Sequence, residues 1–106
     1  MDAYLVITNL PDRDSAAKLA HALIERRLAA CVNILSPCRS VYRWQGRTED
    51  AEEFPMLIKT TRERYPELEA AIRAAHPYEL PEIIVVPLAG GLPAYLEWVN
   101  SETRPA

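Results

Sequence analysis

Two prolines fix the chain's course around the segment His76-Pro77-Tyr78-Glu79-Leu80-Pro81-Glu82. Pro77 disfavours helical backbone at the residue before it, so the helix that is predicted to begin near Pro66 must end by His76. Beyond Pro81, the run 82–88 is rich in β-branched residues and predicts a strand. The segment therefore connects a short second helix to the last strand of the core.

Strand-like and helix-like segments alternate along the rest of the chain. Asp12 or Asp14 can accept hydrogen bonds from the first amides of a helix whose apolar residues recur at helical spacing up to Leu28. Ser36-Pro37 must break the second strand, since proline cannot donate to a β-ladder, and Gly46 provides a turn. These signals predict strands at 3–8, 30–45, 53–61 and 82–88, and helices at 13–28, 66–75 and from 93 onward.

The order of these elements, β-α-β-β-α-β with a terminal helix, is the ferredoxin-like plan of an α+β protein, formed as a single domain over residues 1–106. The second and third strands form an extended hairpin. Both helices of this plan pack on one face of the sheet, so the other face should be polar. The runs 4–7 and 83–86 are apolar throughout, however, so the last helix, the hairpin or another subunit must cover that face.

The charge pattern disfavours nucleic acid as a partner. The 12 basic and 15 acidic residues are interspersed and leave a net charge of -3, without the basic surface that phosphate backbones require. No apolar stretch reaches membrane-spanning length and no leader pattern follows Met1, so we expect a cytoplasmic protein without a membrane partner. Cys31 and Cys38 fit no zinc or redox spacing, and we expect free thiols there.

Distinctive blocks of residues follow one another along most of the chain. They are Leu28-Ala29-Ala30-Cys31-Val32-Asn33-Ile34, then Ser40, Tyr42, Trp44 and Gly46, then Glu53 with Lys59-Thr60, then His76-Pro77-Tyr78-Glu79 with Pro81-Glu82, and finally Tyr95-Leu96 with Trp98. Together these blocks resemble the CutA divalent-cation tolerance family.

This resemblance implies a ferredoxin-like subunit in a homotrimer similar to the nitrogen-regulatory PII proteins, with long hairpins joining across subunits. It also implies an association with a divalent metal ion, copper first and zinc as the alternative, without an assigned reaction. Arg43, Thr48 and Pro55 depart from the family pattern. We expect Pro55 to interrupt its strand and the seam between subunits to differ locally.

One end of the predicted sheet gathers a candidate metal site. In the ferredoxin-like plan, the ends of the first strand and second helix lie beside the start of the last strand, so His76, Asp12, Glu79 and Glu82 share this end. One imidazole with several carboxylates can bind a borderline divalent ion. The alternative is that His76 ends the helix by donating to its last carbonyls while the carboxylates are solvated.

Other residues have a structural and a functional interpretation. Cys31 opens a strand at the opposite end of the sheet from the candidate metal site, so it could join that site only across subunits; otherwise it is a small buried residue. Lys59 could receive an anion, but pairing with Glu53 or another carboxylate is favoured. Tyr42 and Trp44 share one face of the hairpin, where they can anchor a partner or cover the chain's own core.

Two functions remain open at this point. The first is a homotrimeric, non-catalytic protein that takes up a divalent ion or an unidentified small ligand in clefts between subunits. The second is a PII-like signalling trimer whose hairpin contacts a target protein. An enzyme is disfavoured because the sequence has no recognisable serine-histidine-acid or cysteine-histidine order.

Overall fold

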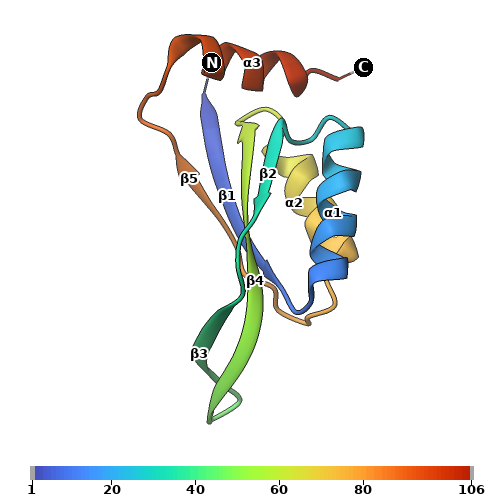
Figure 1. Cartoon of the computed structure of the whole chain (residues 1–106), viewed down its shortest axis with the longest axis vertical. Coiled ribbons are helices and arrows are strands. Elements are labelled where there is room, and N and C mark those ends of the chain that lie inside the picture. Colours follow the sequence, from blue (N-terminus) through green and yellow to red (C-terminus); the bar gives the residue numbers. More distant parts are fainter. Residues whose placement is uncertain (1, 106) are drawn as a thin grey trace.

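A computed structural model describes residues 2–105, in which the strands form an antiparallel sheet with α1 and α2 on one face and α3 across one end (Figure 1). The elements in chain order are β1 (Ala3–Leu10), α1 (Arg13–Glu25), β2 (Cys31–Ile34), β3 (Cys38–Trp44), β4 (Arg47–Thr61), α2 (Tyr65–Ala75), β5 (Ile83–Pro87) and α3 (Pro93–Glu102). The strand order is β2-β4-β1-β5, with β3 paired to β4. This is the ferredoxin-like arrangement that the sequence predicts. Within residues 2–105, none of the helices has the length and apolar character needed to cross a membrane.

Strand β4 joins the sheet to the hairpin. Its second half pairs with β1, from Leu10 opposite Phe54 to Ala3 opposite Thr61, while its first half pairs with β3. Gln45 and Gly46 connect β3 to β4 with φ angles of 50° and 79°, the two-residue turn whose twist matches that of the strands. The hairpin therefore projects beyond the sheet, at the end away from α3 (Figure 1).

The core lies between the sheet and the two helices α1 and α2. Alternate residues of β1 and β4 are buried there and meet the apolar stripes of both helices. These side chains include Val6, Leu10, Met56 and Ile58 from the strands and Leu19, Leu23, Leu68 and Ile72 from the helices. Burying one such side chain contributes about 1.5–3 kcal/mol, so this layer fixes the position of β1 and the helix ends beside it.

Three details differ from the sequence prediction. Helix α1 ends at Glu25, because Arg27 adopts a left-handed conformation (φ 58°) and the Leu28 N–H donates back to the Leu23 carbonyl over 2.9 Å. Strand β4 begins six residues earlier than predicted, since pairing with β3 holds its polar first half extended. Pro55 does not interrupt β4; it lies opposite Asn9, near the end of the β1 ladder, where one missing donor is tolerated.

The sheet face opposite the helices is apolar and open. The strand register places Leu5, Ile7, Leu57, Ile84 and Val86 on this face. Ile84 and Val86 are 49% and 42% exposed, although each lies in a strand paired to the centre of the sheet. Helix α3 lies across the far end of the sheet, and the hairpin projects from the other end (Figure 1). Neither of the two intrachain coverings that the sequence left open therefore closes this face over β5.

Candidate functional site

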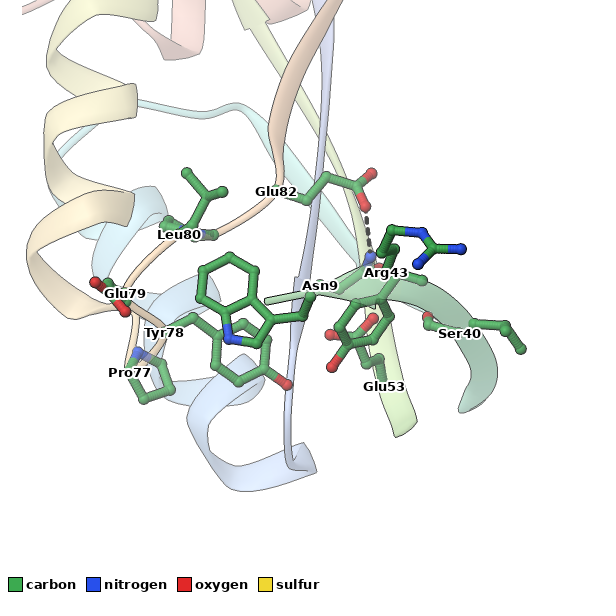
Figure 2. Close-up of a pocket in the computed structure, with 13 residues that line it drawn as sticks. Asn9, Ser40, Arg43, Glu53, Pro77, Tyr78, Glu79, Leu80 and Glu82 are labelled. Carbon is green, nitrogen blue, oxygen red and sulfur yellow. Dashed lines mark hydrogen bonds between the residues drawn. The ribbon is translucent and has the colours of Figure 1, made fainter. Parts of the chain in front are cut away.

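A cleft of about 830 Å³ opens between the hairpin and the turn that joins α2 to β5. The hairpin contributes residues 40–44 and Glu53, the turn contributes residues 77–82, and Asn9 comes from the end of β1. In Figure 2 the turn and the hairpin face each other across this space, with Asn9 and Glu82 joined by a hydrogen bond. Small-molecule sites in proteins usually have volumes of about 300–1,000 Å³. The cleft has the size of a ligand site.

His76 holds the turn in place by using both of its ring nitrogens. Its Nε2 lies 2.6 Å from the Asn9 carbonyl oxygen, which can only accept, so Nε2 carries the proton. Its Nδ1 accepts from the Tyr78 backbone N–H over 3.2 Å. The imidazole is only 8% exposed and its ring centroid lies 4.8 Å from that of Tyr78. It does not donate to the last carbonyls of α2, which the sequence left open; it connects α2 to β1.

Asn9 is the point where three segments meet. Its backbone carbonyl accepts from His76, and its side-chain Nδ2 donates to Glu82 Oε1 over 3.0 Å. Because Glu82 directly precedes β5, these two contacts tie the end of α2 and the start of β5 to the end of β1. The turn between them, with its two prolines, is thereby fixed at both ends.

Glu53 and Tyr78 face each other where the hairpin meets the turn. Glu53 is only 7% exposed. Burial, the adjacent Glu53 carboxylate with which its hydroxyl group hydrogen bonds, and nearby Tyr42 raise the pKa of Tyr78 to about 12. The Tyr78 side chain extends from the turn toward Glu53 in Figure 2. Tyr78 is therefore a neutral hydrogen-bond donor at neutral pH.

The four residues predicted for a metal site lie at the same end of the sheet but have separate contacts. Asp12 caps α1: its two carboxylate oxygens accept from the Ser15 N–H (2.7 Å) and hydroxyl (2.9 Å), and these bonds lower its pKa. His76 uses both nitrogens on backbone groups, and Glu82 accepts from Asn9. Glu79 is exposed at the cleft. Among residues 2–105, no three His, Cys, Asp or Glu side chains are grouped to hold a metal ion. Joint metal binding by these four residues stays a prediction.

Cys31 and Lys59 lie side by side on the open sheet face. Lys59 Nζ donates to Asn33 Oδ1 and lies 4.0 Å from Cys31 Sγ. The predicted pairing of Lys59 with Glu53 is wrong, because these residues are six positions apart along the single strand β4. Cys31 is half-buried rather than buried. Burial and the neighbouring Cys31 thiol raise the pKa of the Tyr95 hydroxyl on α3.

Sequence reasoning missed two residues that build the cleft. Asn9 was assigned only to a turn, yet it makes both contacts that fix the segment 76–82. Glu53 carried no predicted role in ligand binding, and its burial arises from packing between the hairpin and Tyr78. The one available signal was an acidic residue directly before the alternating apolar positions of β4.

The comparisons with known proteins cover nearly the whole chain. The model of the family described as CutA1 divalent ion tolerance protein matches residues 4–102. The chain is 42% identical over 99 residues to "Divalent-cation tolerance protein CutA" of Thermus thermophilus. The matched region covers 93% of this chain and 96% of that protein. A protein of the same name from Pectobacterium atrosepticum is 41% identical over 103 residues, covering 97% of this chain and 94% of that protein.

The fold is likewise similar to solved structures. The crystal structure of CutA from Xylella fastidiosa matches with a TM-score of 0.95 at 42% sequence identity, covering 98% of this chain and 100% of that chain. The similarity thus includes the hairpin and the turn 77–82, which form the two walls of the cleft.

Proposed function

The chain belongs to the CutA1 divalent ion tolerance protein family, and on that premise we propose that it is a homotrimeric, non-catalytic protein that binds a small ligand in the cleft. The cleft carries the proposal, because its walls combine aromatic rings, a buried carboxylate and a neutral phenol donor. Apolar walls with a few placed polar groups are typical of ligand sites. The histidine beside the cleft offers no free base, since both ring nitrogens contact backbone groups.

Mapping of bound fragments tests the cleft directly. In amide-resolved NMR spectra of the labelled protein, we expect small polar-aromatic fragments to shift the signals of Asn9, Glu53 and Tyr78. These residues come from three different elements that meet only at the cleft. Shifts that cluster elsewhere, or a fragment set without any effect on the cleft, would contradict the proposal.

The open sheet face supports the homotrimer. Apolar patches of this kind usually mark an interface with another protein surface. Burying Ile84 and Val86, now 49% and 42% exposed, against other subunits would explain why strands with a solvent-facing side are apolar throughout. Light scattering during gel filtration should give a mass of three 12.0 kDa subunits at micromolar concentration. A monomer mass would overturn the assembly.

We also propose that the protein binds a divalent metal ion, copper first and zinc as the alternative. The residues predicted for this site are His76, Asp12, Glu79 and Glu82. Within one subunit His76 and Asp12 already use their ligand atoms in hydrogen bonds, so the exposed Glu79 and Glu82 are the more available ligands. We therefore propose metal uptake only at a site shared between subunits. Calorimetry of metal-free protein with Cu²⁺ and Zn²⁺ should give heat that Glu79→Gln and Glu82→Gln reduce. Heat that neither substitution changes would remove both carboxylates from the site.

The signalling function stays as the second candidate because of one feature of the hairpin. Val41 is 65% exposed near the middle of β3, on a hairpin that extends away from the core (Figure 1). Such a side chain can contact a target protein. A partner that co-purifies with the wild type and is lost with Val41→Asp would favour signalling; retention of that partner would exclude this contact.

A further inference from the structure

Glu53 lies in the wall of the cleft with only 7% of its surface exposed, and its carboxylate forms no ion pair within residues 2–105. The three ion pairs found among residues 2–105 all involve other carboxylates. A carboxylate that is partly withdrawn from water is stabilised by a nearby cation or by several hydrogen bonds. Tyr78 supplies one neutral hydrogen bond, which leaves the negative charge in place. A cation from outside the chain would satisfy this group.

Arg43, the arginine that lines the cleft, does not serve as that cation. The β3–β4 register places Arg43 on the hairpin face opposite Glu53, because Arg43 pairs with Thr48 whereas Glu53 pairs with Cys38. Two further carboxylates, Glu79 and Glu82, line the cleft against this single arginine. The cleft is therefore negative overall, with Glu53 as its most buried charge.

Aromatic rings form much of the remaining wall. Tyr42 and Trp44 share the hairpin face of Glu53 but lie farther toward the hairpin tip, opposite Glu49 and Arg47, and Tyr78 faces Glu53 from the turn. The faces of such rings attract cations, and the attraction grows when water is displaced from the cation. A divalent metal ion demands several oxygen or nitrogen ligands, whereas an organic ammonium needs one counter-charge and an apolar surround.

We infer that the cleft binds an organic cation, an ammonium group on an apolar body, with Glu53 as its counter-charge and the rings of Tyr42, Trp44 and Tyr78 as its walls. This inference rests on the proposed function of the cleft as a ligand site and names the chemical class of the ligand. The Tyr78 hydroxyl orients the Glu53 carboxylate, and the ammonium occupies the side of that carboxylate open to the cleft.

Tryptophan fluorescence can follow this binding. The chain has two tryptophans, and Trp98→Phe leaves Trp44 of the cleft as the single emitter. This variant is titrated with 2-phenylethylammonium, with 2-phenylethanol as the neutral analogue and with 3-phenylpropionate as the anionic one. We expect a saturable change with the ammonium, and binding of the alcohol and the carboxylate weaker by at least about tenfold, since hydrogen bonds to charged groups are the stronger class.

Two substitutions in the Trp98→Phe background test whether binding depends on the charge of Glu53. Glu53→Gln keeps the shape and should weaken ammonium binding by about tenfold or more. Glu52→Gln removes the same charge from the opposite hairpin face and should leave binding unchanged. The comparison of the three ligands on the protein with intact Glu53 remains decisive even if Glu53→Gln folds poorly.

Each outcome bears on the inference. Preference for the ammonium, lost in Glu53→Gln and kept in Glu52→Gln, supports it. Equal binding of the alcohol, or unchanged binding in Glu53→Gln, overturns the cation while leaving the cleft as a ligand site. No change with any of the three ligands also overturns it, and the fragment mapping then decides on the cleft itself. Glu53-dependent binding of Zn²⁺ without ammonium binding overturns it in favour of a metal.

Discussion

Replacing His76 with alanine removes the connection between α2, β1 and the turn. Two hydrogen bonds are lost, and the Asn9 carbonyl and the Tyr78 N–H are left without their partner. Each partly buried group that loses its hydrogen-bond partner costs about 1–1.5 kcal/mol, so we expect the free energy of unfolding to fall by about 2–3 kcal/mol. This is a large share of the roughly 5–15 kcal/mol that stabilises a domain.

Urea unfolding followed by circular dichroism measures this loss. At an m-value of about 1–3 kcal/mol per molar urea, the midpoint should fall by roughly 1–3 M. The protein concentration must be the same in all samples, because assembly contributes to stability. The chain offers a matched control, since its only other histidine, His21, is exposed on α1. His21→Ala should stay within about 0.5 kcal/mol of the wild type.

Two results would refute this reasoning. If His76→Ala unfolded at the wild-type midpoint and lost copper or zinc binding, the imidazole would serve a metal ion and its backbone contacts would add nothing to stability. If both histidine variants lost the same stability, the effect would not arise from the contacts of His76 with Asn9 and Tyr78.

Three further predictions concern other parts of the molecule. Thr8→Val should stabilise the protein by about 1 kcal/mol in urea unfolding, because the buried Thr8 Oγ1 has no hydrogen-bond partner within residues 2–105; an unchanged or lower midpoint would show that the hydroxyl is satisfied. The raised pKa of Tyr78, about 12, means that the unfolded chain loses this proton first, so stability should fall between pH 10 and 12. Tyr78→Phe should reduce that fall, and an equal fall in both proteins would place its cause in other tyrosines. Ile84→Glu puts a charge on the open sheet face and should shift the light-scattering mass from trimer toward monomer, whereas an unchanged trimer would exclude this face from the interface.

The fold was predictable where local chemistry decides it. Pro77 and Pro81 set the turn, and the apolar stripe that begins after Asp12 sets α1, because each acts on its own neighbours. The end of α1 was missed because Arg27, a residue without the freedom of glycine, adopts a left-handed conformation there. The first half of β4 was missed because its charged residues carry no strand pattern and become a strand only by pairing with β3.

The sequence predicted where the site lies but not which contacts form it. His76 was predicted to belong to the site, but the carbonyl that His76 contacts is that of Asn9, 67 positions earlier in the chain. The burial of Glu53 is likewise a property of two segments that meet in space, the hairpin and the turn that carries Tyr78. Spacing along a sequence does not report such contacts, so the prediction selected carboxylates near His76 and passed over the more buried one.

Strand β4 connects the hairpin, the cleft wall and the sheet. The same uninterrupted strand runs from the hairpin tip at Arg47, past Glu53 in the cleft wall, to Thr61 beside β1. A change in the angle of the hairpin would therefore move one wall of the cleft. A protein that bound one hairpin angle in preference to another would change the affinity of the cleft for its ligand, and by thermodynamic reciprocity the ligand would change the affinity for that protein by the same factor.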